Sequence, residues 1–181
     1  DDLSNNFSNA LSSNIRFLFI GAVLPHKGAH IIAQAAQMIN TNENIHFDIY
    51  GFYNEEYGAA IKAIDKSNLI TLHGEYFSDD LLEISKNADV AILPSLWEDC
   101  APFVITEYLS MGLPVIASNI GGVFDFIKEG HNGSYFQTGD PRALASVLQA
   151  LIDNPFKILQ MQKNCRVNMQ LEDYVEHKIN I

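Results

Sequence analysis

Three carboxylates stand close together in the segment 96-LWEDCAPFVITEYLSMGLPVIAS-118. Asp99 follows Glu98 in a stretch typical of a loop, whereas Glu107 lies in a pattern that predicts a helix. A loop carboxylate and a carboxylate near the start of a helix can converge on one side of a pocket, where they accept hydrogen bonds from hydroxyl groups. Such a pair suits a sugar or a ribose. The alternative is that Glu107 is an ordinary exposed glutamate on a surface helix.

Anion-binding groups are expected in two places. The backbone N–H groups from about Phe103 to Ile105 open a predicted helix and are free to bind an anion. The glycine loop 21-GAVLPHKG-28 places Lys27 just before another helix, so Lys27 and that helix N-terminus could share a phosphate. Its spacing matches neither the P-loop nor the G-x-G-x-x-G pattern, and a solvated lysine in a plain strand–helix turn fits it equally well.

Short apolar runs alternate with helical patterns along the chain. Strands are predicted at 15–20, 45–50, 70–72, 90–93, 114–117 and 133–136. Helices are predicted at about 28–39, 55–65, 78–86, 103–111, 123–127 and 141–153, with Ser78 as an N-cap and Pro141 at the first helical position. Short buried strands separated by helices indicate an α/β fold, a doubly wound parallel sheet of about six strands with helices on both faces.

Glycine or polar residues follow each predicted strand. Gly21, Gly51, Gly74 and Gly121 come after four of the strands, and Pro94 and Ser95 follow a fifth. Ligands of open parallel sheets bind beyond the carboxyl ends of the strands, where the strand order reverses. Glycine-containing loops let backbone N–H groups approach a ligand closely. We therefore expect the binding site at this edge of the sheet.

Composition and charge limit the possible partners. The chain has 181 residues, 48% apolar and 18% charged, which is typical of one globular domain. A formal net charge of −11 argues against a nucleic acid or an anionic membrane surface as the main partner. No apolar run approaches the roughly 18–20 residues that span a bilayer. Residues 1–14 are polar and acidic and are expected to form a linker or a truncated tail.

Several other chemistries are disfavoured. Cys100 and Cys165 lie far apart without metal-ligand spacing, so they are expected to be reduced thiols of a cytoplasmic protein. The six histidines show no HxH spacing, and no D-x-D occurs, so no metal site is expected. The G-x-S-x-G motif of α/β-hydrolases is also absent.

A set of motifs resembles one enzyme family. The segment 94-PSLWEDCAPFVITEYLSMGLPVIASNIGG-122 resembles the E-x7-E region of retaining glycosyltransferases of family 4, also called group 1, which have the GT-B fold. The segments FIGAVLPHKG, DIYG, ITLHGEY, NADVAILPS and EGHNGSYFQTGDPRALASVLQAL resemble further motifs of this family in the same order. The resemblance covers about residues 15–152.

The resemblance implies roles for individual residues. Lys27 would bind the donor phosphate, and Glu107 would bind the ribose hydroxyls of the nucleotide. Seven residues separate Asp99 from Glu107, so Asp99 rather than Glu98 matches the first motif carboxylate, which faces the donor sugar. Lys27 and Asp99 are therefore the expected catalytic residues. The expected donor-binding residues are Gly21, Gly51, Gly74, Tyr76, Ala101, Pro102, Phe103, Val104 and Glu107.

Three positions depart from the family pattern. Ala22 stands where the family often has an arginine, so one phosphate-binding cation is missing unless His26 or a residue elsewhere replaces it. Asp99 is one methylene shorter than the usual glutamate, and Asp125 replaces the glutamate of the G-G-x-x-E motif. The first two departures concern the affinity for the donor and its identity.

The resemblance also implies that two domains of the enzyme have different functions. Residues 15–181 would form the C-terminal, Rossmann-like half of a GT-B enzyme, which binds a nucleotide diphosphate sugar without a metal cofactor. An N-terminal domain of the same parent chain would bind a glycan or lipid-linked acceptor, in the cytoplasm or at the inner face of a membrane, and this piece alone would be inactive. The alternatives are a non-catalytic nucleotide or sugar binding module and, less favoured, a sugar-nucleotide epimerase-like domain.

Overall fold

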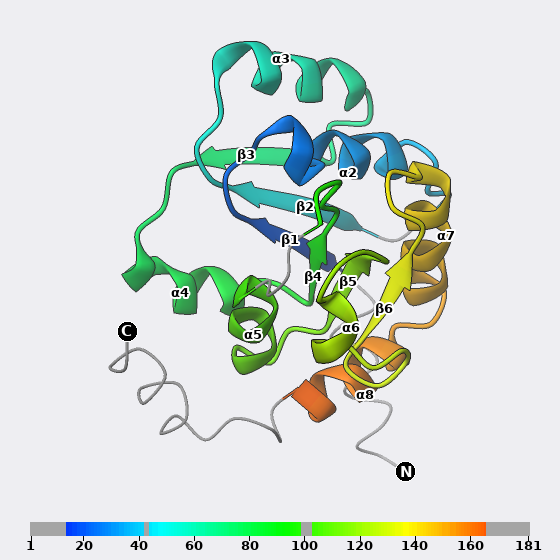
Figure 1. The fold of residues 1–181 in the computed structure, drawn as a ribbon. Helices are drawn as coiled ribbons and strands as arrows, with labels where there is room; N and C mark the ends of the chain where they lie inside the picture. Colours follow the sequence, from blue (N-terminus) through cyan, green and yellow to red (C-terminus); the bar gives the residue numbers. More distant parts are fainter. Residues whose placement is uncertain (1–13, 42–43, 99–102, 166–181) are drawn as a thin grey trace.

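The computed structural model describes residues 14–41, 44–98 and 103–165 and has a six-stranded parallel sheet at its centre (Figure 1). The strand order is β3-β2-β1-β4-β5-β6. The strands are β1 (Ile15–Ile20), β2 (Ile45–Tyr50), β3 (Ile70–Gly74), β4 (Val90–Leu93), β5 (Val115–Ser118) and β6 (Gly133–Phe136). The predicted fold class, a doubly wound parallel sheet, is confirmed.

Helices cover both faces of the sheet (Figure 1). They are η1 (Pro25–Lys27), α2 (Ala29–Ala36), α3 (Glu55–Ile64), η2 (Ser78–Asp80), α4 (Leu81–Lys86), α5 (Phe103–Ser110), α6 (Val123–Phe126), α7 (Pro141–Ile152) and α8 (Phe156–Cys165). Side chains of β1 alternate between two cores: Phe17 and Phe19 pack with α2, α3 and α7, and Leu18 and Ile20 pack with α5 and α6. Both faces of β1 are thus covered, as expected for a central strand of a doubly wound sheet.

The predicted elements are found with small shifts at their ends. Strand β3 extends to Gly74, β5 begins at Val115, and α2 covers only Ala29–Ala36. Pro141 is the first residue of α7, where the carboxylate of Asp140 caps two backbone N–H groups. The prediction that Ser78 caps a helix is wrong, because Ser78 already lies inside η2 and the preceding N–H, that of Phe77, donates to the Asp80 carboxylate at 3.0 Å.

The strand order reverses between β1 and β4. The β1–β2 ladder runs from Ile15 to Ile20, whereas the β1–β4 ladder contains only the pairs Phe17↔Val90 and Leu18↔Ala91. The carboxyl end of β1 therefore has a neighbouring strand on one side only. Crevices of this kind are where doubly wound sheets bind ligands. Within the described part of the chain, no helix is both long and apolar enough to cross a membrane.

Candidate functional site

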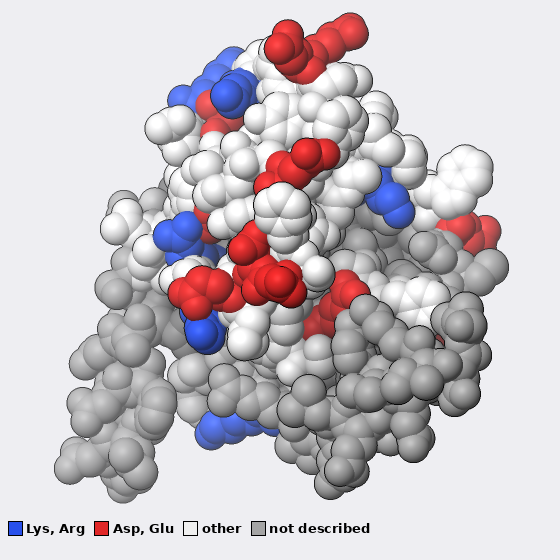
Figure 2. Space-filling model, turned by 90° about the vertical axis from the view of Figure 1, so that its left-hand side faces the viewer, with Lys and Arg blue, Asp and Glu red and all other residues white. Residues whose placement is uncertain are grey.

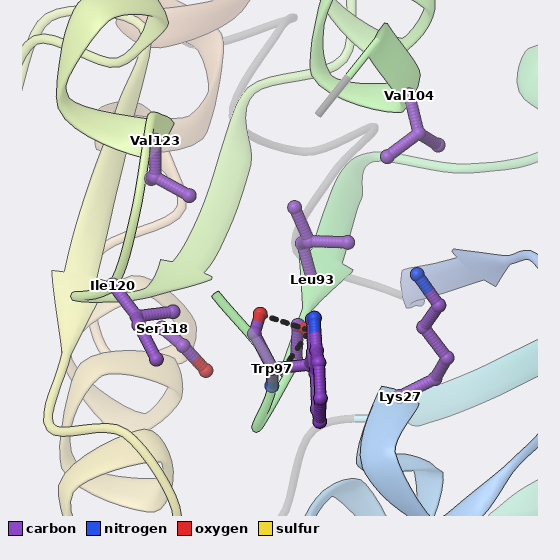
Figure 3. A pocket seen from close by; sticks show the side chains of 8 residues that line it. Lys27, Leu93, Trp97, Val104, Ser118, Ile120 and Val123 are labelled. Atoms are coloured by element: carbon purple, nitrogen blue, oxygen red, sulfur yellow. Dashed lines mark hydrogen bonds between the residues drawn. The ribbon is translucent and has the colours of Figure 1, made fainter. Parts of the chain in front are cut away.

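A pocket lies at the carboxyl ends of β4 and β5 and reaches the loop that follows β1 (Figure 3). Its lining consists of Lys27, Leu93, Ser95, Trp97, Val104, Ser118, Ile120 and Val123. Four separate segments of sequence contribute to it: η1, the end of β4 with its loop, the first turn of α5, and the end of β5 with α6. The pocket thus forms at the predicted edge of the sheet.

Lys27 is held beside the β4 loop by backbone contacts. Gly28 follows it in the left-handed conformation, with φ of 80°, and a Cβ at this position would lie 1.9 Å from the carbonyl oxygen of Pro94. The N–H of Leu96 donates to the C=O of His26 at 2.8 Å. No carboxylate of the described residues forms an ion pair with Lys27. Its ammonium group is therefore available for an anion at the start of α2.

The three predicted site glycines Gly21, Gly51 and Gly74 lie next to one another. The N–H of Gly21 donates to the C=O of Tyr50 at 3.0 Å, and the N–H of Gly51 donates to the C=O of Gly74 at 2.7 Å. A Cβ on Gly51 would lie 1.8 Å from the carbonyl oxygen of Gly21. Close packing of the loops after β1 and β2 therefore explains Gly51 without a ligand, and a role in donor binding stays a prediction.

Tyr76 and Glu107 also come together, from the loop after β3 and from α5. Burial raises the pKa of the Tyr76 hydroxyl, and the nearby Glu107 carboxylate raises it further. Both side chains are partly exposed, so each keeps access to a ligand. A carboxylate beside an aromatic ring is a suitable arrangement for a ribose and its base, because the carboxylate accepts hydroxyl hydrogen bonds and the ring offers a stacking face.

The site also includes the start of α5. Val104 lines the pocket, and Phe103 is 69% exposed. Asp99, Ala101 and Pro102 lie outside the described residues, so their predicted roles remain predictions. Glu98 is exposed.

Sequence reasoning did not assign Ser95, Trp97 or Ser118 to the site. The Ser95 hydroxyl donates to the C=O of Trp97 at 3.0 Å and accepts its N–H at 3.3 Å, which fixes this turn. The Trp97 ring lies edge-on to His26, with 6.5 Å between ring centroids. The sequence signal that could have found them was their position next to the predicted strands 90–93 and 114–117, because residues at the carboxyl ends of these strands lie at the predicted crevice.

Acidic side chains are exposed on the face of the molecule that carries β3 and α4 (Figure 2). The segment of η2 and α4 contributes Asp79, Asp80 and Glu83, and Lys86 forms an exposed ion pair with Glu83 at 3.0 Å. An anionic ligand is repelled by such a surface, so its binding depends on local positive charge such as Lys27. Among residues 14–41, 44–98 and 103–165, no group of three or more His, Cys, Asp or Glu side chains is arranged to hold a metal ion.

A second polar cluster lies on the β1–β3 half of the sheet. The Asp48 carboxylate accepts hydrogen bonds from Nε and Nη2 of Arg16 at 3.0 and 2.6 Å. Nε2 of His73 lies 2.7 Å from the other oxygen of Asp48, and the His73 ring stacks on Tyr50 with 4.0 Å between centroids. These bonds satisfy the carboxylate of a residue that is only 5% exposed.

The fold and the crevice define a Rossmann-like domain of the GT-B type. The chain belongs to the glycosyl transferases group 1 family, whose match covers residues 14–154. The family expected from the sequence motifs is thereby confirmed.

Individual relatives agree with this assignment. The chain is 30% identical over 173 residues to the UDP-Gal:alpha-D-GlcNAc-diphosphoundecaprenol alpha-1,3-galactosyltransferase of Escherichia coli, covering 91% of this chain and 43% of that protein. It is 24% identical over 147 residues to the N,N'-diacetylbacillosaminyl-diphospho-undecaprenol alpha-1,3-N-acetylgalactosaminyltransferase of Campylobacter jejuni, covering 81% of this chain and 38% of that protein. The chain thus spans less than half the length of these two relatives.

Solved structures show the same fold. Anabaena Alr3699/HepE, solved in complex with UDP and glucose, superimposes with a TM-score of 0.76 at 19% identity, covering 90% of this chain and 45% of that one. The catalytic domain of cholesterol-alpha-glucosyltransferase from Helicobacter pylori gives a TM-score of 0.73 at 16% identity, covering 90% of this chain and 98% of that one.

Proposed function

We propose that this chain is the donor-binding domain of a retaining glycosyltransferase, which uses a nucleotide diphosphate sugar. The observation that supports this most directly is the position of Lys27, which lines one pocket with the first turn of α5 and has no ion-pair partner among the described residues. A lysine beside helix N-termini is suited to a diphosphate, because its charge and the helix dipoles both favour an anion.

Each part of the donor has a candidate partner in this proposal. Lys27 stabilises the charge of the departing diphosphate, which is an electrostatic contribution to catalysis. Glu107 accepts hydrogen bonds from the ribose, and Tyr76 borders the base. Asp99 faces the donor sugar, as the family resemblance implies. The bond from the anomeric carbon to the diphosphate oxygen is replaced by a bond to an acceptor oxygen on the same face of the sugar.

The acceptor and the rest of the enzyme belong to the same proposal. Two relatives are named for transfer to sugars linked to diphosphoundecaprenol, which favours a lipid-linked acceptor. Such an acceptor would place the enzyme at the inner, cytoplasmic face of a membrane. Because the chain spans less than half of those relatives, we propose that an N-terminal domain supplies acceptor binding. The 181-residue chain alone then binds the donor without transferring the sugar.

Calorimetric titration with uridine diphosphate and guanosine diphosphate tests the proposal. We expect one of the two to bind, and we expect Lys27→Ala and Glu107→Ala each to weaken it by about 10- to 100-fold, since a hydrogen bond to a charged group contributes about 1.5–3 kcal/mol.

Matched controls come from the exposed pair Lys86 and Glu83 on α4. Lys86→Ala and Glu83→Ala make the same chemical changes outside the pocket and should leave the affinity unchanged. The proposal is wrong if neither nucleotide binds at millimolar concentration. The site assignment is wrong if Lys27→Ala and Glu107→Ala match the controls.

A further inference from the structure

One buried hydroxyl in the pocket has no hydrogen-bond partner among residues 14–41, 44–98 and 103–165. Ser118 is the last residue of β5 and is 1% exposed, yet its Oγ forms no hydrogen bond within the described part of the chain. Leaving a buried hydroxyl unsatisfied costs about 1–3 kcal/mol, and native proteins rarely do so. The hydroxyl is therefore free to bond to a further partner, which a bound ligand can supply.

Ser95, which lines the same pocket, provides the contrast. Its hydroxyl both donates to and accepts from the backbone of Trp97, so its hydrogen-bonding capacity is used within the protein. Figure 3 shows the Ser118 oxygen directed into the pocket, with Trp97 between it and Lys27. Among the residues that the structure describes, the Lys27 ammonium has no ion-pair partner and the Ser118 hydroxyl has no hydrogen-bond partner, and the two groups lie at separate places in the pocket.

The surroundings of the two groups differ in charge. The pocket residues on the side of Ser118 are Ile120 and Val123, which are apolar, and Lys27 is the cation of the lining. A phosphate placed against Ser118 would lose its hydration beside apolar side chains without a counter-charge, which is unfavourable. A neutral sugar hydroxyl can instead donate to and accept from a serine hydroxyl.

We propose that the Ser118 hydroxyl binds a hydroxyl group of the donor sugar while Lys27 binds the diphosphate. This inference rests on the proposed function and goes beyond it, because it assigns the sugar part of the ligand to the end of β5. Ser118 then contributes to the choice of donor sugar.

The test compares Ser118→Ala with the unmodified chain in calorimetric titrations with UDP, UDP-glucose and UDP-galactose. We expect roughly tenfold weaker binding of the preferred UDP-sugar and unchanged binding of UDP, as loss of one well-formed hydrogen bond implies. Equal affinity of both proteins for a UDP-sugar that binds would overturn the inference alone. An equal loss for UDP and the UDP-sugar would place the hydroxyl at the diphosphate and also overturn it. If the unmodified chain binds none of the three, the proposed function fails for uridine nucleotides and the inference with it.

Thermal unfolding without ligand gives a second measurement. Because Ser118→Ala removes an unsatisfied polar group, we expect the Tm to stay equal or to rise, in contrast to Ser95→Ala, which breaks the turn at Trp97 and should lower it. Ser146→Ala, on the exposed side of α7, is the control that should change neither Tm nor affinity. A clear drop in Tm for Ser118→Ala would show that the hydroxyl has an internal partner, and the inference would be wrong.

Discussion

The hydroxyl of Tyr108 takes the place of a neighbouring strand for Ile20, the last residue of β1. It accepts the N–H of Ile20 at 2.7 Å and donates to the C=O of the same residue at 3.3 Å. The N–H of Gly21 bonds to Tyr50 on β2, so the backbone groups of Ile20 face the β4 side, where the ladder has already ended at Leu18. One side chain of α5 thus satisfies the backbone at the crevice and joins the helix of Glu107 to the loop of Lys27.

Removing this hydroxyl should destabilise the fold. Tyr108→Phe keeps the buried ring but leaves the N–H of Ile20 without a partner, so we expect the free energy of unfolding to fall by about 1–3 kcal/mol. Urea denaturation at neutral pH measures it. Tyr53→Phe is the matched control, because the Tyr53 hydroxyl forms no hydrogen bond with the described residues. Equal stability of the two variants would contradict the role given to Tyr108.

Tyr108 should also make the free energy of unfolding decrease at alkaline pH. Burial raises the pKa of the Tyr108 hydroxyl well above its usual value near 10. The folded state therefore keeps a proton that the unfolded state releases, and stability that is complete below about pH 10 is lost as the pH rises further, by about 1.4 kcal/mol per pH unit. Denaturation between about pH 9 and 11 should show a shallower decline for Tyr108→Phe than for the unmodified chain. Parallel declines would show that Tyr108 is not the responsible group.

The sequence allows the strands to be predicted more fully than the contacts between elements. Continuous apolar runs such as Val90–Leu93 predict buried parallel strands, because only a strand covered on both faces needs them. The pairing of Tyr108 with Ile20 could not be predicted in this way. It joins residues 88 positions apart and depends on where the β1–β4 ladder ends.

In the candidate site, too, some residues could be predicted from the sequence and others could not. Lys27 and Glu107 could be selected from the sequence because their motif spacing is local. Ser118 was passed over, because an unsatisfied hydroxyl becomes visible only when all surrounding side chains are in place. The predicted cap at Ser78 failed because η2 begins one residue earlier than expected, so that Phe77 and not Ser78 holds the N-cap position.

The Asp48 cluster should contribute to stability without contributing to nucleotide binding. Asp48→Ala removes the partner of Arg16 and of His73, and we expect a loss of about 1.5–3 kcal/mol in the free energy of unfolding. Glu83→Ala breaks an exposed ion pair and should change it little. Urea denaturation and UDP titration of both variants measure the two effects. A loss of UDP affinity in soluble, folded Asp48→Ala at low temperature would place the cluster in the binding site instead.

Donor binding should not require a divalent metal ion. In the proposed site the positive charge comes from Lys27 and from helix N-termini, so we expect the Kd for UDP to agree within about twofold between buffers containing EDTA and buffers containing magnesium chloride. Raising the ionic strength should weaken binding in both, because the charges are partly exposed. A tenfold weaker affinity in EDTA would mean that a metal supplies the charge that is assigned here to Lys27.

Gly51 and Gly74 should respond differently to the same substitution, although both have positive φ, of 142° and 82°. In Gly51→Ala the new Cβ would meet the carbonyl oxygen of Gly21 at 1.8 Å. This clash involves backbone atoms, so it can be relieved only if the loops after β1 and β2 move apart. Gly74→Ala meets no atom within 4 Å, so only the conformational cost of about 1–2 kcal/mol remains. We expect Gly51→Ala to lose about 3 kcal/mol or more, or to fail to accumulate as folded protein. Urea denaturation of both variants measures the difference, and equal losses would mean that conformation rather than close packing selects glycine at position 51.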